Sequence, residues 1–305
     1  MSYNVWQDSI FPDADPQKVF RGYGSKADEF VRLVKAVAPD CLCLQEISPY
    51  HNPQKVGDIL DGALPLADGE RWRTHSASDN VIASRFDLLM CDEELIPVVH
   101  MGHAMALVDL PDVEHGDDLY LICAHLMGKG GKDNIAFRQH HADAIIRWIR
   151  DVKTLGGEIN LPPDTPMIVL GDFNVYDTDP AYQLTTLLTG DIADEGTYGP
   201  DIPPDWDGTD LADALPRHNA SGEDTYTWRD DTQPYNPGVL DRILYTDSVI
   251  RVDNAFVLNT TIMSESALDA TVLEAGDEML DPEMGNYDHL PLVVDVILRS
   301  APDQR

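Results

Sequence analysis

Basic residues are scarce in this sequence. Its 305 residues include 21 Lys and Arg against 54 Asp and Glu, which gives a formal net charge of −33. A chain of this charge repels polyanions at long range, which argues against tight non-specific binding to nucleic acid. Two explanations remain: a surface suited to a high-salt cytoplasm, or carboxylates that bind cations. Because the acidic excess is spread along the chain, we expect a solvated acidic surface on which only a few carboxylates carry chemistry.

Long hydrophobic runs are absent as well. No run approaches the roughly 18 apolar residues of a membrane span, and the N-terminus lacks the basic and apolar segments of a secretory leader. The default expectation is a cytoplasmic protein without a transmembrane segment. The first six residues already resemble the second half of a strand, so a natural chain that starts further upstream, with a leader, is an open alternative.

Cysteine is rare too, and no two cysteines form a C-x-x-C pair. Three of the four lie in apolar, strand-like runs, a pattern that favours small buried thiols in a reducing compartment over disulfides or a zinc site. The cysteines are Cys41, Cys43, Cys91 and Cys123.

The most informative stretch that is present runs from Met167 to Asn174. Four apolar residues predict a buried strand, which is interrupted at Gly171. If strand geometry continues past Gly171, Asp172 and Asn174 point to the same side, at a strand end where open α/β sheets tend to place ligands. The alternative is a strand end whose polar residues only form a turn. This stretch alone does not decide between the two.

The remaining chain predicts strands that alternate with helices early and cluster late. This order indicates a mixed α/β sandwich, which we expect to form one domain over residues 1–300. Ser25 is the expected N-cap of the first helix. Acidic loops are expected at 190–224 and 262–286, and the first is long enough to suggest a functional loop rather than a linker. Strands are expected at 1–6, 41–44, 81–84, 96–110, 119–124, 167–170, 225–228, 239–245 and 290–298, and helices at 25–37, 56–60 and 136–152.

Five of the strand-like runs end in, or carry, polar groups with chemical potential. If these strands share one edge of the fold, the groups converge in one cleft. Any one of them alone could equally be a surface or loop residue. They are Asn4, Glu46, His125, Asp172 with Asn174, and Asp288 with His289.

Such a set would support metal-assisted chemistry on a phosphoester. Glu46, Asp288 and the amide oxygen of Asn4 are hard oxygen ligands, which suit Mg²⁺ or Mn²⁺ better than Zn²⁺. A bound Mg²⁺ polarises a phosphoryl oxygen and neutralises developing charge. Asp172, with Asn174 close by, would orient or deprotonate the attacking water.

The histidines have complementary roles in this scheme. His125 and His289 are candidates to contact the phosphate or to protonate the leaving oxygen. Asp241 would fix the orientation of a histidine ring, as a carboxylate does in a Ser-His-Asp triad. We find no secure carboxylate partner for His125 in the sequence.

Six motifs, taken in order, resemble the endonuclease/exonuclease/phosphatase superfamily, which has the fold of pancreatic deoxyribonuclease. The resemblance extends from residue 3 to about residue 298. It implies an α/β fold, a four-layer sandwich of two packed mixed β-sheets flanked by helices, with a Mg²⁺-dependent phosphoesterase site at the strand ends. The motifs are Tyr3-Asn4-Val5-Trp6, Leu44-Gln45-Glu46, Ala124-His125-Leu126, Gly171-Asp172-Phe173-Asn174, Leu240-Asp241-Arg242-Ile243 and Asp288-His289-Leu290-Pro291.

The resemblance also implies roles for individual residues. Asn4, Glu46 and Asp288 would belong to the metal site, and Asp172 with Asn174 would position the nucleophile. Asp241 would pair with His289, and His125 would be the second histidine. Asn80 precedes a strand that resembles a family strand and would line the cleft. The sequence departs from the family at Tyr287, where Ser usually precedes Asp-His; we expect this to alter loop packing more than chemistry.

The family hydrolyses many phosphoesters, so the substrate must be argued separately. Lys129, Lys132 and Arg138 follow His125 closely and would form a phosphate clamp; the alternative is a solvated helix start. Tyr176 stands where inositol polyphosphate 5-phosphatases have Arg, which disfavours that activity. Because the long loops are acidic, we expect a small or lipid-derived phosphodiester rather than long duplex DNA. Alternatives are hydrolysis of a phosphomonoester, a DNA or RNA nuclease, and a non-catalytic binding protein.

Overall fold

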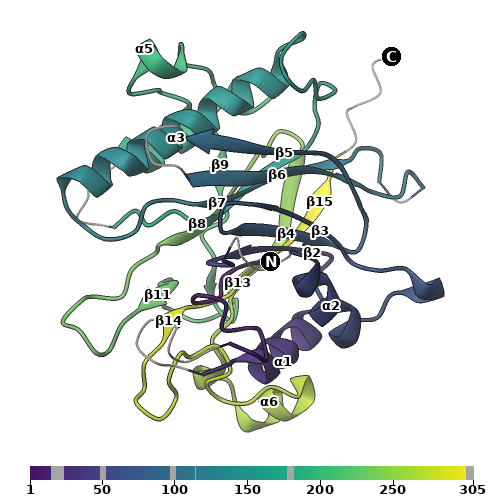
Figure 1. Cartoon of the computed structure of the whole chain (residues 1–305), viewed down its shortest axis with the longest axis vertical. Helices are drawn as coiled ribbons and strands as arrows, with labels where there is room; N and C mark the ends of the chain where they lie inside the picture. The colour runs from purple at the N-terminus through teal and green to yellow at the C-terminus, as the bar shows by residue number, and fades with distance from the viewer. Residues whose placement is uncertain (15–23, 49–52, 97–100, 114, 177–181, 300–305) are drawn as a thin grey trace.

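The protein is a sandwich of four layers, as seen in a computed structural model (Figure 1). The structure describes the chain except for residues 15–23, 49–52, 97–100, 114, 177–181 and 300–305. Two large mixed sheets pack face to face, with helices on both outer sides. The predicted fold class is therefore confirmed.

The first sheet has seven strands in the order β10-β13-β15-β1-β2-β4-β3. Its central strand β1 runs parallel to β2 and antiparallel to β15. The strands are β1 (Ser2–Asn4), β2 (Cys41–Gln45), β3 (Arg73–Ala77), β4 (Asn80–Ser84), β10 (Arg217–His218), β13 (Ile250–Val257) and β15 (Leu292–Leu298).

The second sheet has six strands in the order β5-β6-β7-β8-β12-β9. Here β7 and β8 are parallel neighbours, and β12 runs antiparallel to β8. A two-stranded sheet of β11 (Trp228–Arg229) and β14 (Asp288–His289) stands beside the large sheets. The six strands are β5 (Asp87–Ile96), β6 (Met101–Asp109), β7 (Leu119–His125), β8 (Met167–Asp172), β9 (Ala212–Asp213) and β12 (Asp241–Tyr245).

Helices cover the outer face of each sheet (Figure 1). The long helix α3 packs on the second sheet, and α1 and α2 pack on the first. Between the sheets lies a third apolar layer that draws on both, for example Ile82 and Leu292 from the first sheet and Leu121 and Leu170 from the second. The helices are α1 (Ala27–Val37), α2 (Gln54–Ala63), α3 (Lys132–Lys153), α4 (Tyr182–Thr189), α5 (Glu195–Tyr198) and α6 (Glu265–Thr271).

The structure corrects several predicted element boundaries. The first helix starts at Ala27, and Lys26 rather than Ser25 occupies the N-cap position. The Ser25 hydroxyl still accepts a hydrogen bond from the backbone N–H of Ala27, at 3.1 Å. Strands β3, β5 and β13 were not predicted; β3 and β5 lie at a sheet edge, and β13 lies between β10 and β15. Edge strands carry polar residues, so the apolar alternation that marks a strand is weak there.

The two predicted loops contain regular structure. Residues 190–224 include α5, β9 and β10, and Ile192, Tyr198 and Leu211 are buried in the core beside α3. The Lys153 ammonium donates to the backbone carbonyl of Asp205 at 2.6 Å, which ties this segment to the end of α3. Residues 262–286 include α6. In the described part of the chain, no helix has the length and apolar character needed to cross a bilayer.

Candidate active site

The polar residues at the strand ends lie close together because two pairs of central strands run parallel: β1 with β2, and β7 with β8. In the first sheet, Asn4 at the end of β1 is level with Gln45, directly before Glu46. In the second sheet, His125 at the end of β7 is level with Asp172 at the end of β8. Strand β12 enters from the opposite direction and sets its first residue, Asp241, against Asp172. The predicted convergence is therefore present in the fold.

Gly171 permits the close approach of β7 and β8 directly before the site. Its φ is +142°, and a Cβ atom there would lie 1.9 Å from the carbonyl oxygen of Ala124. Any side chain would therefore displace the backbone that aligns His125 with Asp172.

We expect Gly171→Ala to destabilise the protein by about 3 kcal/mol or more and to lower activity per folded molecule, since β8 must shift. Gly128→Ala is the matched control, because its Cβ would meet Asn174 only at an ordinary contact distance of 3.7 Å. Urea unfolding followed by circular dichroism measures both effects. Equal stability of the two variants would contradict the steric argument.

Asp172 is the shared acceptor at the centre of the site. Its Oδ2 atom accepts from the side-chain amide of Asn4 at 3.1 Å and from that of Asn174 at 2.9 Å. Its Oδ1 atom accepts from the backbone N–H of Asn174 at 2.9 Å. Burial, together with the Asp241 carboxylate, raises the pKa of Asp172 to about 6, although His289 and His125 counteract the rise. The group is therefore largely ionised at neutral pH but more basic than a surface aspartate.

Two histidines face Asp172, and each is held from behind by a carboxylate. His289 is paired through Nδ1 with Asp241 at 2.8 Å, and His125 is paired through Nδ1 with Asp79 at 2.7 Å. Both Nε2 atoms lie 3.5 Å from the Asp172 Oδ2 atom. Burial lowers the pKa of His125, but the carboxylates of Asp79, Asp172 and Glu46 together outweigh it and raise that pKa to about 10. The pKa of His289 is raised well above its usual value because Asp241 and Asp172 outweigh burial.

Asp79 is the functional candidate that the sequence did not identify. It lies in the two-residue turn between β3 and β4, in a segment where no strand was predicted. A prediction of the β3–β4 hairpin would have identified Asp79, because the turn of this hairpin brings Asp79 next to the end of β7.

Glu46 and Asp288 border the other side of the site. Glu46 accepts from the Asn4 side-chain amide at 3.1 Å and, through Oε2, from the backbone N–H of Gln7 at 3.0 Å. Asp288 accepts from the indole N–H of Trp228 at 3.2 Å. Burial, together with the nearby Glu46 and Asp172 carboxylates, raises the pKa of Asp288 to about 7. The carboxylates of this side of the site thus repel one another.

This donor set fits a divalent cation. The Oδ1 atom of Asp241 and the Oδ2 atom of Asp288 are buried and have no hydrogen-bond partner among the described residues. Asp172, Asp241 and His289 each offer an atom within 4.8 Å of the others, a spacing that could hold a metal. The Asn4 amide is oriented differently from the prediction: its nitrogen faces the carboxylates, and its oxygen accepts from the backbone N–H of Trp6 at 3.2 Å.

Two predicted substrate contacts are buried instead. Asn80 has no exposed surface and donates to the carbonyl of Gly102 at 2.9 Å. Arg138 is equally buried, and its guanidinium donates to the carbonyls of Met127 and Lys129 at 2.8 Å. Both side chains therefore hold the backbone around the site rather than presenting a surface to substrate.

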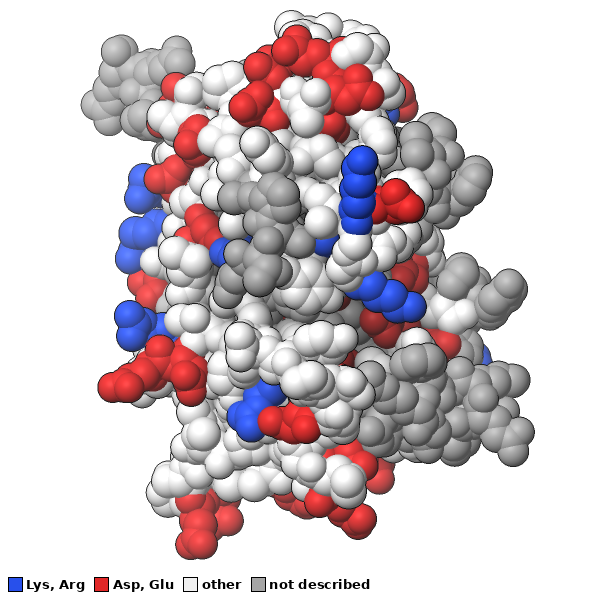
Figure 2. Space-filling model, turned by 90° about the vertical axis from the view of Figure 1, so that its left-hand side faces the viewer, with Lys and Arg blue, Asp and Glu red and all other residues white. Residues whose placement is uncertain are grey.

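Lys129 and Lys132 are exposed, as a phosphate clamp would require. Figure 2 shows the side of the molecule on which β11 and β14 lie. Acidic side chains predominate at the upper and lower ends of this face, and basic side chains lie mainly in its middle part. The middle of this face thus carries basic side chains although the net charge of the chain is strongly negative.

Residues 1–262 match the model of the endonuclease/exonuclease/phosphatase family. The chain belongs to this family. Members of the family are generally metal-dependent hydrolases of phosphoesters, in agreement with the donor set. No curated protein is similar enough in sequence to count as a match.

Solved structures of family members share the fold of this endonuclease/exonuclease/phosphatase protein at low sequence identity. One from Bacteroides vulgatus is 16% identical, with a TM-score of 0.59 and coverage of 98% of this chain and 97% of that one. D. rerio TDP2 in complex with a single-strand DNA product is 17% identical, with a TM-score of 0.55 and 97% coverage of both chains. The human Nocturnin catalytic domain with bound sulfate is 16% identical, with a TM-score of 0.52 and coverage of 97% and 92%.

Proposed function

We propose that this protein is a Mg²⁺- or Mn²⁺-dependent phosphodiesterase that acts on a small or lipid-derived substrate by in-line attack of water. One observation carries the proposal: the Asp172 carboxylate lies 3.5 Å from two imidazole Nε2 atoms, each belonging to a ring that a second carboxylate orients. This arrangement supports a proton acceptor at Asp172 and two donors to phosphate oxygens at the histidines.

The protonation states support a different proposed role for each group. Asp172, with a pKa of about 6, is ionised at neutral pH and accepts the proton of the attacking water. Asn174 and Asn4 fix its carboxylate by hydrogen bonds. His125 and His289 are protonated at the same pH, so their Nε2 atoms donate to the phosphate oxygens or to the leaving oxygen.

Glu46 and Asp288, with Asp172 and Asp241 nearby, would hold the cation. When bound, a divalent ion would polarise the phosphoryl oxygen and neutralise charge that develops on it, an effect worth several kcal/mol. The same charge would relieve the repulsion that raises the pKa of Asp288.

The surface favours a compact substrate. With a net charge of −33, the protein repels a long polyanion, whereas a single phosphodiester needs only the donors of the site. Tyr176, Trp228 and Tyr235 form an aromatic cluster beside Asp288, with ring centroids about 6 Å apart. Such a cluster can contact the apolar part of a small ester.

The first test is hydrolysis of bis-p-nitrophenyl phosphate and p-nitrophenyl phosphate with Mg²⁺, Mn²⁺ or EDTA. We expect metal-dependent turnover with a preference for the diester. Plasmid DNA and a glycerophosphodiester are the second pair of substrates. A strong preference for plasmid DNA would contradict the proposal and favour the alternative, a nuclease. Binding of substrate without turnover would indicate a non-catalytic family member.

Glu46→Gln tests the metal site directly. We expect at least about a tenfold weaker affinity for Mg²⁺ in calorimetric titration, because a neutral amide replaces a charged oxygen ligand. Glu70→Gln is the control, since Glu70 is exposed and remote. Equal Mg²⁺ affinity of both variants and the parent would contradict the assignment of Glu46, whatever the activity.

A further inference from the structure

An apolar groove, the α1–α6 groove, lies on the outer face of the first sheet between helices α1 and α6. Its volume is about 360 Å³, within the range of roughly 300–1,000 Å³ that is usual for small-molecule sites. The floor consists of two cross-strand pairs of β13 and β15, namely Phe256 with Val293 and Asn254 with Asp295. The walls carry the apolar side chains of Ala36, Val37, Leu258, Met263 and Leu273.

Apolar side chains continue from this groove onto the surface. Ile262 is 56% exposed and Val272 is 75% exposed. Each directly precedes a residue that lines the groove, Met263 in the first case and Leu273 in the second. Leu273 is itself buried, in one apolar cluster with Leu33 of α1. Exposed apolar surface beside a concave site is typical of a binding surface, and an occupant that fits it has an apolar body.

The floor of the groove also carries a negative charge. Among the described residues that line it, Asp295 is the one ionisable group, and no Lys or Arg is present. The side-chain amide of Asn254 donates to the Oδ2 atom of Asp295 at 3.2 Å. In the described part of the chain, the Oδ1 atom of Asp295 and the amide oxygen of Asn254 have no hydrogen-bond donor. Two acceptors without a donor or a basic neighbour suit a cationic head group, which has donors only.

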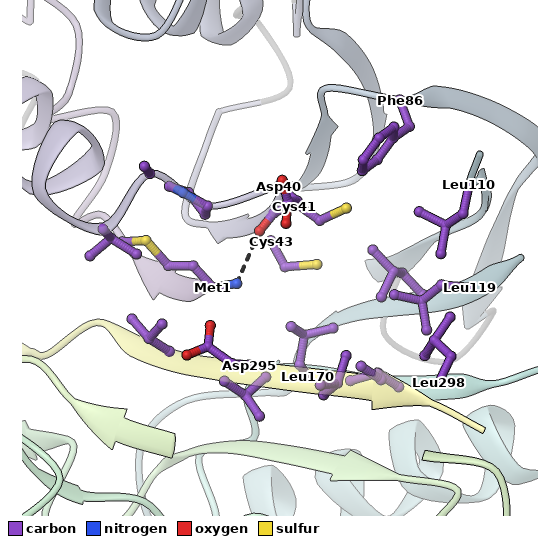
Figure 3. A pocket seen from close by; sticks show the side chains of 18 of the residues that line it. Met1, Asp40, Cys41, Cys43, Phe86, Leu110, Leu119, Leu170, Asp295 and Leu298 are labelled. Atoms are coloured by element: carbon purple, nitrogen blue, oxygen red, sulfur yellow. Dashed lines mark hydrogen bonds between the residues drawn. The ribbon is translucent and has the colours of Figure 1, made fainter. Parts of the chain in front are cut away.

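The groove is distinct from a second cavity, which lies between the two sheets. Figure 3 shows this inter-sheet cavity, with a volume of about 250 Å³ and with Leu119 and Leu170 among the side chains around it. Asp295 borders both cavities. Leu119 and Leu170 line the inter-sheet cavity alone. Met263 and Leu273 line the α1–α6 groove alone, so the two pairs of side chains distinguish a ligand in one place from a ligand in the other.

We propose that the α1–α6 groove binds a small amphiphilic amine. The ammonium group donates to the Asp295 carboxylate and to the amide oxygen of Asn254, and the apolar body packs on Phe256 and the apolar walls. The net charge of −33 raises the concentration of such a cation near the surface, and the groove supplies the contacts that retain it. The site is separate from the candidate active site, and the proposal does not depend on the hydrolase activity.

Three probes that share one alkyl chain and differ in the head group test the proposal: n-octylamine, octanol and octanoate. We expect the affinity in calorimetric titration to fall in that order, with octanoate about tenfold weaker than octylamine. Methyl NMR spectra of the protein labelled at leucine and methionine locate the ligand. Octylamine should shift the methyl signals of Met263 and Leu273 in a saturable manner and leave those of Leu119 and Leu170 unchanged.

Asp295→Asn keeps the shape of the side chain and removes its charge. We expect it to weaken octylamine binding by about fivefold and to leave octanol binding unchanged, because the lost contact is an exposed ion pair. Asp253→Asn is the matched control. Asp253 is exposed on the same strand as Asn254, lies 2.9 Å from Arg251 and does not line the groove. The control changes the net charge equally and should keep octylamine affinity within about twofold of the parent.

Several outcomes would overturn the proposal. Equal affinities for octylamine and octanoate would show that the head group is not recognised. Equal losses with Asp295→Asn and Asp253→Asn would reduce the binding to general attraction by an acidic surface. Absence of saturable octylamine binding, or shifts at Leu119 and Leu170 in place of Met263 and Leu273, would remove the groove as the site.

Discussion

Asp172→Asn is expected to lower kcat/KM for diester hydrolysis by about 10³-fold while the protein remains folded. The substitution keeps the shape of the side chain but removes the group that accepts the proton from water. It also places an amide where Asp172 now receives hydrogen bonds from Asn4 and Asn174. Steady-state hydrolysis of bis-p-nitrophenyl phosphate, with far-UV circular dichroism on the same samples, measures both properties.

Asp205→Asn is the matched control for this experiment. Asp205 is also fully buried, but it caps a distant loop through the backbone N–H of Ser248 at 3.1 Å. Its substitution should lower the melting temperature and leave kcat within about threefold of the parent. If Asp172→Asn retained more than a tenth of the parent activity, Asp172 would not be the proton acceptor.

The positions of the central strands were predictable because they are buried on both sides. Met167–Leu170 and Leu119–Ala124 form apolar runs in the sequence, and both are core strands in the second sheet. The polar residue that follows each run marks the strand end. Strands β7 and β8 are parallel neighbours, so the two residues that end these runs, His125 and Asp172, lie level with each other at the site.

The edge strands were less predictable for a physical reason. Residues 73–77 carry mostly polar side chains, and residues 87–96 have four acidic residues among six apolar ones without strict alternation; an edge strand has less surface to bury. Missing β3 meant missing its hairpin turn and therefore Asp79, the carboxylate that orients His125. The local sequence of Asp79 resembles any polar turn, and only the pairing of β3 with β4 places it at the site.

Asn80 and Arg138 were predicted to bind substrate, but both side chains are buried. Both are polar, near predicted site residues, and suited in chemical type to bind phosphate. Their burial depends on contacts with Gly102 and Met127, which lie on other segments. A sequence pattern indicates which residues are near the site along the chain, but tertiary packing decides whether a side chain faces the cleft.

His289→Ala is expected to lower kcat by about 10²–10⁴-fold, because it removes an Nε2–H donor 3.5 Å from Asp172. His218→Ala is the matched control. That histidine is also buried, in the edge strand β10 of the first sheet, with its ring hydrogen-bonded to the Tyr226 carbonyl at 2.7 Å and to Asn259 at 3.1 Å. The control should lose stability but keep kcat within about threefold.

A comparison of esters with different leaving groups distinguishes the two roles proposed for His289. If the imidazolium protonates the leaving oxygen, the loss should be larger for an alkyl ester, whose alkoxide is a poor leaving group, than for a p-nitrophenyl ester. If it only binds a phosphate oxygen, the loss should be similar for both esters. Asp241→Asn should follow the same pattern with a smaller loss, since Asp241 acts by orienting the ring. Activity of His289→Ala within tenfold of the parent on both esters would contradict both roles.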